Sequence, residues 1–246
     1  YAHIPVNKDG DYQQLNDSIL QIENEFYGTI RPKRSAASGE RPLAALGQRG
    51  VEYIEVRCVD LDPFTPIGID LEHINFLDTF LLLCLLTESP TDSREESARM
   101  VRNQTAVVEN GRQLGLMLER DGESITLQQW AAELLAECAK VATLMDQHSN
   151  SALYHDTLTA QLAKIENPDL TPSARVIQAL GQGTSFFQFT MQRAQQHSDF
   201  FAAQPADADS QALLSDEARR SWLKQAEIED ADRLSFSDFV HDYLAI

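Results

Sequence analysis

The sequence contains few cysteines, no long apolar run and none of the common nucleotide-binding or hydrolase motifs. Its 3 cysteines, Cys58, Cys84 and Cys138, lie far apart and form no CxxC pair. This spacing excludes a disulfide framework and is typical of a reducing compartment, so we expect a cytoplasmic protein. The longest apolar run, residues 80–86, is too short to cross a bilayer, and no membrane is expected as a partner. A glycine-rich phosphate loop, GxGxxG, GxSxG and HExxH are all absent.

Positive charge is also scarce. The chain has 20 Lys and Arg against 38 Asp and Glu, which gives a formal net charge of −18. An acidic surface repels the phosphates of nucleic acids and of anionic lipids, so no nucleic acid is expected as a partner. A local cluster of basic residues therefore stands out against this background.

The character of the sequence changes along its 246 residues, which are enough to bury a core. Residues 1–69 are typical of strands and loops, residues 70–202 of helices, and residues 203–246 of a charged helical tail after a short linker over 203–210. We expect an α+β fold, with part of an antiparallel sheet in the first quarter and helices in most of the rest. Because the chain begins at Tyr1 and its strands are too few to close a sheet, we expect a fragment of a longer protein.

Capping residues and apolar periodicity predict the individual helices. Asp70 fits the N-cap of a buried helix over 74–86, and Gly111 fits the end of a helix over 92–110. Thr171 places a cap before a proline at the first helical position. Further helices are expected over about 126–145, 151–166, 171–180, 185–202 and 215–246, strands over 22–27 and 51–57, and a mobile surface loop over 35–39.

The strand expected over residues 51–57 carries the strongest functional signal. Alternate side chains of an extended chain point to opposite sides, so Tyr53, Glu55 and Arg57 share one face. A carboxylate supplies the oxygen ligand that Mg²⁺ prefers, and a guanidinium about 6.5 Å along the strand can hold a phosphate oxygen. The alternative is a surface ion pair without a function.

The strand expected over residues 22–27 carries a second polar set. Glu23, Glu25 and Tyr27 would share a face, and two neighbouring carboxylates repel each other unless a cation or a substrate amine lies between them. Glu23 is thus a second candidate metal ligand and Glu25 a candidate substrate ligand. Both can instead be solvated acids on an edge strand.

A short basic cluster follows this segment. Arg31, Lys33 and Arg34 form a positive island in an acidic chain. A positive island beside carboxylates suits a polyphosphate, so these three residues are candidate cofactor-binding residues. The alternative is solvated charge on a loop.

Several blocks of the sequence resemble one family, bacterial glutamate–cysteine ligase of the proteobacterial type. The blocks agree in order and spacing from about residue 1 to residue 180, which is far more specific than one short motif. They are QIENEFY at 21–27, IRPKR at 30–34, EYIEVR at 52–57, DPF at 62–64 with PIG at 66–68, and NPDLT at 167–171 with SAR at 173–175.

This resemblance covers the C-terminal half of the family and implies an ATP-dependent ligase. Such an enzyme joins the γ-carboxyl group of L-glutamate to the amine of L-cysteine, as the first step of glutathione synthesis, on a fold similar to glutamine synthetase. Matched position by position, Glu55 corresponds to a Mg²⁺ ligand, with Mn²⁺ as a substitute. Arg57 corresponds to a catalytic arginine at the transferred phosphoryl group and the glutamate, and Tyr27 to a residue of the cysteine pocket.

The resemblance also implies that other parts of the site lie upstream of Tyr1, including most of the metal-binding glutamates, a histidine ligand and much of the cysteine pocket. We therefore expect the missing N-terminal half as a partner, and a monomer when the protein is complete. Two alternatives stay open. The chain can be a non-catalytic fragment of the enzyme, or a helical interaction protein whose strand motifs arose by coincidence.

Overall fold

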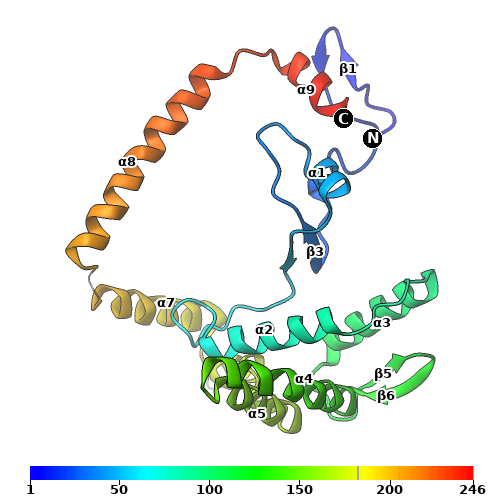
Figure 1. Cartoon of the computed structure of the whole chain (residues 1–246), viewed down its shortest axis with the longest axis vertical. Coiled ribbons are helices and arrows are strands. Elements are labelled where there is room, and N and C mark those ends of the chain that lie inside the picture. Colours follow the sequence, from blue (N-terminus) through cyan, green and yellow to red (C-terminus); the bar gives the residue numbers. More distant parts are fainter. Residues whose placement is uncertain (182, 205, 246) are drawn as a thin grey trace. The chain divides into compact units, whose positions relative to one another are not determined.

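The computed structural model describes residues 1–181, 183–204 and 206–245, and the chain divides into two compact units (Figure 1). The first unit contains Tyr1–Asp60 and Ala206–Ile246, and the second contains Leu61–Pro205. The domain boundaries expected after residues 69 and 202 stay a prediction. Among the described residues no helix is long and apolar enough to span a membrane.

Two small antiparallel ribbons lie in the first unit, one of which carries the predicted polar face. In the first ribbon, β1 (Asn7–Lys8) pairs with β2 (Asp11–Tyr12) across Asp9 and Gly10, whose positive φ angles of 55° and 96° suit a tight hairpin. In the second ribbon, β3 (Ile30–Lys33) pairs with β4 (Tyr53–Val56). The strand predicted over residues 51–57 is thereby confirmed for its central part.

Helices complete the first unit. Helix α1 (Pro42–Arg49) contacts β3 and was not predicted from the sequence. Helices α8 (Ala208–Ala231) and α9 (Phe236–Leu244) form the tail, so α8 begins inside the segment that was expected to be a linker. The ring of Phe236 lies edge-on to Tyr12 with centroids 5.7 Å apart, which places the start of α9 beside β2.

The strand predicted over residues 22–27 is wrong. Residues Glu23–Glu25 form a 3₁₀ turn, η1, in which the Glu25 N–H donates to the carbonyl of Ile22 at 3.1 Å. The Glu25 carboxylate also turns back and accepts a hydrogen bond from the Gln21 N–H at 2.8 Å. These local hydrogen bonds compete with a ladder, so the alternation of Glu23, Glu25 and Tyr27 does not place them on a strand face.

The second unit is built on three packed helices. Helices α2 (Leu71–Leu86), α4 (Leu127–Ser149) and α5 (Leu153–Glu166) pack against one another (Figure 1). Their shared core contains Leu135, Cys138, Ala142 and Leu158, with rings such as Phe80 packed against it. Helix α3 (Arg94–Asn110) contacts β5 (Met117–Arg120), whose hairpin partner β6 (Glu123–Thr126) contacts α4. The elements η2 (Pro168–Leu170), α6 (Pro172–Leu180) and α7 (Phe186–Ala202) follow α5.

Most helix ends agree with the predicted caps. Asp70 accepts a hydrogen bond from the His73 N–H, and Thr171 caps α6 ahead of Pro172. The predicted helices over 92–110, 151–166 and 185–202 are present within two residues at each end. The hairpin at Asp121–Gly122 was not predicted, although an Asp-Gly pair between alternating residues is a recognised hairpin signal.

Candidate functional site

The β3–β4 ribbon places a compact set of charges on one of its faces. In the register of the two strands, Arg31 lies opposite Glu55 and Lys33 lies opposite Tyr53. Directly opposed residues of an antiparallel pair point to the same side, so these four side chains share one face. The ladder extends beyond both strand ends, because the Arg57 N–H donates to the Thr29 carbonyl at 2.7 Å and the Glu52 N–H donates to the Lys33 carbonyl at 2.9 Å.

The carboxylate of Glu55 is the centre of this charge cluster. Arg57 Nη2 donates to Glu55 Oε2 at 3.0 Å, and Lys33 Nζ lies 3.6 Å from the same oxygen. The hydrogen bond from Arg57 lowers the pKa of Glu55, and the positive charges of Arg57, Lys33 and Arg31 lower it further. Glu55 is therefore fully ionised at neutral pH, and the sequence prediction that Glu55 and Arg57 lie side by side is confirmed.

Tyr27 joins the cluster from outside the ribbon. The guanidinium carbon of Arg57 lies 5.2 Å from the centroid of the Tyr27 ring, which is a cation–π contact. The side chain of Tyr27 remains 78% exposed. Five of the predicted site residues thus lie together, namely Tyr27, Arg31, Lys33, Glu55 and Arg57.

Glu23 and Glu25 are engaged elsewhere. Arg41 holds Glu23 with two parallel hydrogen bonds of 2.9 and 3.0 Å, and the hydrogen bond from Arg41 lowers the pKa of Glu23. Sequence reasoning missed Arg41. This residue lies 18 residues downstream of Glu23, and the sequence did not indicate that the two side chains would pair. Glu25 accepts from the Gln21 backbone. Within the described residues, no ion pair links either carboxylate to the Glu55 cluster.

The basic cluster is divided between two carboxylates. Arg31 and Lys33 face Glu55, whereas Arg34 Nε lies 3.8 Å from Glu52 Oε2. The same Glu52 oxygen accepts a hydrogen bond from the Ser35 N–H at 2.9 Å, which ties the start of the 35–39 loop to the ribbon. The face therefore holds Arg31, Lys33 and Arg57 around a single carboxylate, and its net charge is positive.

As a metal ligand, Glu55 fits only in part. A carboxylate oxygen is the donor type that Mg²⁺ and Mn²⁺ prefer. Across residues 1–181, 183–204 and 206–245, however, no group of three or more His, Cys, Asp or Glu side chains could hold a metal ion. Glu55 can contribute one oxygen to a cation that other groups also bind, such as the oxygens of a phosphate.

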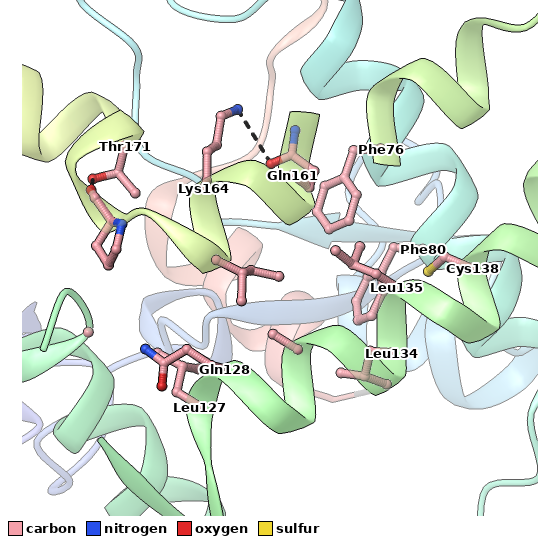
Figure 2. A pocket seen from close by; sticks show the side chains of 14 residues that line it. Phe76, Phe80, Leu127, Gln128, Leu134, Leu135, Cys138, Gln161, Lys164 and Thr171 are labelled. Atoms are coloured by element: carbon pink, nitrogen blue, oxygen red, sulfur yellow. Dashed lines mark hydrogen bonds between the residues drawn. The ribbon is translucent and has the colours of Figure 1, made fainter. Parts of the chain in front are cut away.

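A separate cavity lies in the second unit, between α2, α4 and α5 (Figure 2). Its volume is about 440 Å³ and its wall is mostly apolar, with Phe76, Phe80 and Leu135 among the lining residues. At its edge Lys164 Nζ and Gln161 Nε2 both lie 3.1 Å from Glu72 Oε1, so the charge of Lys164 is already matched. The sequence predicted the apolar faces that form this wall but contained no signal for the cavity itself.

Comparison with known proteins identifies the family. Residues 1–107 match the family described as glutamate–cysteine ligase. The chain is 45% identical to the glutamate–cysteine ligase of Pseudomonas fluorescens strain Pf0-1 and 46% identical to that of Azotobacter vinelandii. Each alignment covers 100% of this chain and 46% of the relative, so the chain spans about half the length of the curated relatives it matches.

Solved structures agree with this result. The crystal structure of glutamate–cysteine ligase from Francisella tularensis in complex with AMP is 35% identical, with a TM-score of 0.85 over 96% of this chain and 47% of that chain. A bifunctional glutathione synthetase from Pasteurella multocida, 22% identical with a TM-score of 0.54 over 73% of this chain and 22% of its own, shares the fold alone.

The fold is α+β, with a cationic β-ribbon in the first unit and a helical second unit, and it matches the solved glutamate–cysteine ligase of Francisella tularensis. By sequence, the whole chain resembles about half of a glutamate–cysteine ligase. Identity of 45% along all 246 residues is incompatible with a helical interaction protein whose motifs match by coincidence.

Proposed function

We propose that this chain supplies part of the active site of an ATP-dependent ligase, which joins the γ-carboxyl group of L-glutamate to the amine of L-cysteine. The observation that carries this proposal is the convergence of Arg57, Lys33 and Arg31 on the face that bears Glu55. A positive face in an acidic chain favours a polyphosphate ligand. The Francisella tularensis relative was crystallised with AMP, which supports an adenine nucleotide.

The chemistry of the proposed reaction has two steps. The γ-carboxylate of glutamate attacks the γ-phosphorus of ATP, which forms γ-glutamyl phosphate and releases ADP. The amine of cysteine then attacks the acyl carbon, loses a proton and displaces inorganic phosphate. In phosphoryl transfer of this type, the protein contributes mainly positioning and charge neutralisation.

Each residue of the ribbon has a proposed role in this scheme. Arg57 is the catalytic residue that binds the equatorial phosphate oxygens, where charge collects during transfer, and it also contacts the glutamate. Lys33 and Arg31, with Arg34 beside them, bind the remaining phosphates. Tyr27, whose ring holds Arg57 in place, contributes to the cysteine pocket. Glu25 is proposed to contact a substrate amine, although its carboxylate now accepts from the Gln21 backbone.

A divalent cation completes the proposed site. Glu55 would give one carboxylate oxygen to Mg²⁺, or to Mn²⁺ in its place, and the cation when bound supplies charge neutralisation at the phosphates. Glu23 is a weaker candidate because its carboxylate is held by Arg41. Since the described residues contain no complete set of ligands, we propose that the remaining ligands belong to a further segment of the protein.

The length of the relatives supports a site that is divided between this chain and a further segment of the protein. The chain aligns with only 46% of the relatives it matches, and a protein of their full length would provide a comparable number of additional residues. We propose a complete enzyme that acts as a monomer in the cytoplasm, where Cys58, Cys84 and Cys138 stay as free thiols. One observation favours the alternative that this chain alone is not catalytic. Among the described residues, Glu55 is the single carboxylate on the ribbon face.

An isotope experiment tests the proposed reaction. The complete protein is incubated with ATP, cysteine and glutamate labelled with ¹⁸O in its γ-carboxyl group. Activation of the carboxyl by phosphate transfers one labelled oxygen to each phosphate released, and mass spectrometry of the phosphate detects it. Release of unlabelled phosphate would exclude the acyl phosphate and the proposed function with it.

A further inference from the structure

The ion pair between Glu23 and Arg41 joins two elements of the first unit. Glu23 is the first residue of η1, and Arg41 is the N-cap of α1, where its carbonyl accepts a hydrogen bond from the Ala45 N–H at 3.0 Å. Helix α1 in turn contacts β3 of the charged ribbon. The pair therefore ties η1 to the helix that contacts the ribbon.

The geometry of this pair fixes direction as well as distance. Arg41 Nε and Nη2 donate to the two carboxylate oxygens of Glu23 at 2.9 and 3.0 Å. Two parallel bonds between a guanidinium and a carboxylate allow little rotation of either group. The side chains are only 21% and 22% exposed, so solvent weakens the pair less than it would on an open surface.

Helix α9 provides a further contact for Arg41. The ring of Tyr243 lies with its centroid 5.9 Å from the guanidinium carbon, which is a cation–π contact. Val240 of the same helix is buried, and Phe236 meets Tyr12 edge-on, so α9 is packed onto this unit. A carboxylate and an aromatic ring thus both hold Arg41, which limits the positions open to Glu23.

The turn η1 leads directly to Tyr27. The Phe26 N–H donates to the Glu23 carbonyl at 3.2 Å and closes the turn, and Tyr27 follows it. The Tyr27 side chain is 78% exposed, so contacts of its own do little to hold it, and the backbone of η1 decides where its ring lies. That ring is the one that contacts Arg57.

The hydrogen bonds upstream of η1 are local. Gln21 Oε1 accepts from the Leu15 N–H at 2.7 Å, and Asn16 Nδ2 donates to the Gln21 carbonyl at 2.6 Å. These bonds shape the loop before the turn but do not connect it to α1. The pair with Arg41 makes that connection.

We propose that Arg41 is a positioning residue for the amino-acid acceptor of the reaction. It holds Glu23 and thereby η1, and η1 places Tyr27 at the proposed cysteine pocket. The inference rests on the proposed function and adds a residue that acts through Glu23 rather than by contact with a substrate. Arg57 is also held by its hydrogen bond of 3.0 Å to Glu55, so loss of Arg41 should spare the phosphoryl end of the site.

Steady-state kinetics of the complete protein test this role, with the formation of γ-glutamylcysteine as the readout. Arg41→Gln should raise the KM for cysteine on the order of 10-fold, because the acceptor pocket is no longer held in place. The kcat and the KM for ATP should stay within about 2-fold of wild type. Arg41→Lys keeps the charge but loses the paired hydrogen bonds, so it should raise the KM for cysteine by about 3-fold, and it decides the matter if Arg41→Gln does not fold.

Glu23→Gln approaches the same pair from its other side. It should raise the KM for cysteine as Arg41→Gln does. The double variant should be no worse than either single variant, because both substitutions remove one shared interaction. Additive effects on the KM for cysteine would contradict the coupling.

Arg49→Gln is the matched control. Arg49 is the last residue of the same helix, and it makes an equivalent pair with Glu40 through hydrogen bonds of 2.7 and 2.8 Å. Loss of that pair should lower the thermal stability about as much as Arg41→Gln does, but the KM for cysteine should not change. A role of Arg41 in stability alone predicts the same KM for both variants.

The outcomes separate this inference from the proposed function. If wild-type protein forms γ-glutamylcysteine but the Arg41 variants leave the KM for cysteine unchanged, or raise the KM for ATP by the same factor, the role of Arg41 is wrong and the proposed function stands. An equally large effect of Arg49→Gln on the KM for cysteine also overturns the inference. If wild-type protein forms no γ-glutamylcysteine from ATP, glutamate and cysteine, the proposed function is refuted, and the inference fails with it.

Discussion

The guanidinium carbon of Arg175 lies 3.7 Å from the centroid of the Phe64 ring. This contact joins two short sequence blocks of the second unit, DPF at 62–64 and SAR at 173–175. Arg193 from α7 lies 4.8 Å from the same ring, and the ring of Phe189 meets Phe64 edge-on. A turn, a short helix and a long helix are thereby fixed to one aromatic side chain.

The first prediction concerns this aromatic contact. Phe64→Leu keeps an apolar side chain but removes the ring that both arginines contact, so we expect a loss of about 1–2 kcal/mol in the free energy of unfolding. Urea denaturation measures it. Phe187→Leu is the control, because Phe187 is 72% exposed and should change stability by less than about 0.5 kcal/mol. Equal effects of the two substitutions would contradict a stabilising role for the stack.

Periodicity and caps predicted much of the fold, because their causes are local. Asp70 and Thr171 cap the helices that follow them, as expected from side chains that satisfy free backbone N–H groups. The strand at Tyr53–Val56 was also predicted, from the alternation of its side chains, and in the structure it pairs with β3. The missed hairpin at Asp121–Gly122 was readable from its turn residues.

The failures have both local and non-local causes. The alternation at Glu23 and Glu25 is that of a strand, but Arg41 draws the first carboxylate away and the Gln21 N–H binds the second. Helix α1 has no acidic residue in its first turn and no side-chain cap, although Pro42 at its start and Gly50 after its end were readable signals. In the site, the sequence placed Glu55 beside Arg57, whereas the approach of Tyr27 and Lys33 depends on pairing between segments.

The second prediction concerns the core of the three-helix group. Leu134 and Leu135 of α4 both line the cavity of Figure 2, but Leu135 is 9% exposed and Leu134 is 38% exposed. Leu135→Ala should destabilise the second unit by about 2–5 kcal/mol, because it removes buried contacts and enlarges the cavity. Leu134→Ala should have a clearly smaller effect in the same thermal or urea measurement. A reversed order would show that the packing is misassigned.

The third prediction concerns Asp146, which caps α5 from the preceding helix. Asp146 is 8% exposed, and its carboxylate accepts hydrogen bonds from the Tyr154 and His155 N–H groups, both at 3.1 Å, and from His155 Nδ1 at 2.8 Å. Burial raises the pKa of Asp146, but the hydrogen bonds, above all the one from His155, outweigh it, and the pKa is lowered. Asp146→Asn should cost about 1–3 kcal/mol near neutral pH.

The lowered pKa fixes the sign of the pH dependence. The ionised carboxylate stabilises the folded chain above the unfolded pKa of about 4, and this contribution is lost as the pH falls through the lower folded pKa. The difference in stability between wild-type protein and Asp146→Asn should therefore shrink below about pH 4. Denaturation curves at several pH values measure it, and a difference that grows toward acid pH would contradict the assignment.

The most direct test of the central claim is the rate of ADP release by Glu55→Gln and Arg57→Gln variants of the complete protein, with ATP, glutamate and cysteine present. We expect both variants to lose at least about 100-fold in turnover while their circular dichroism spectra stay unchanged. Glu119→Gln is the control, because Glu119 makes a similar exposed pair with Arg102 at 2.7 Å in the second unit and should keep wild-type turnover. Near-normal ADP release by either ribbon variant would contradict the account.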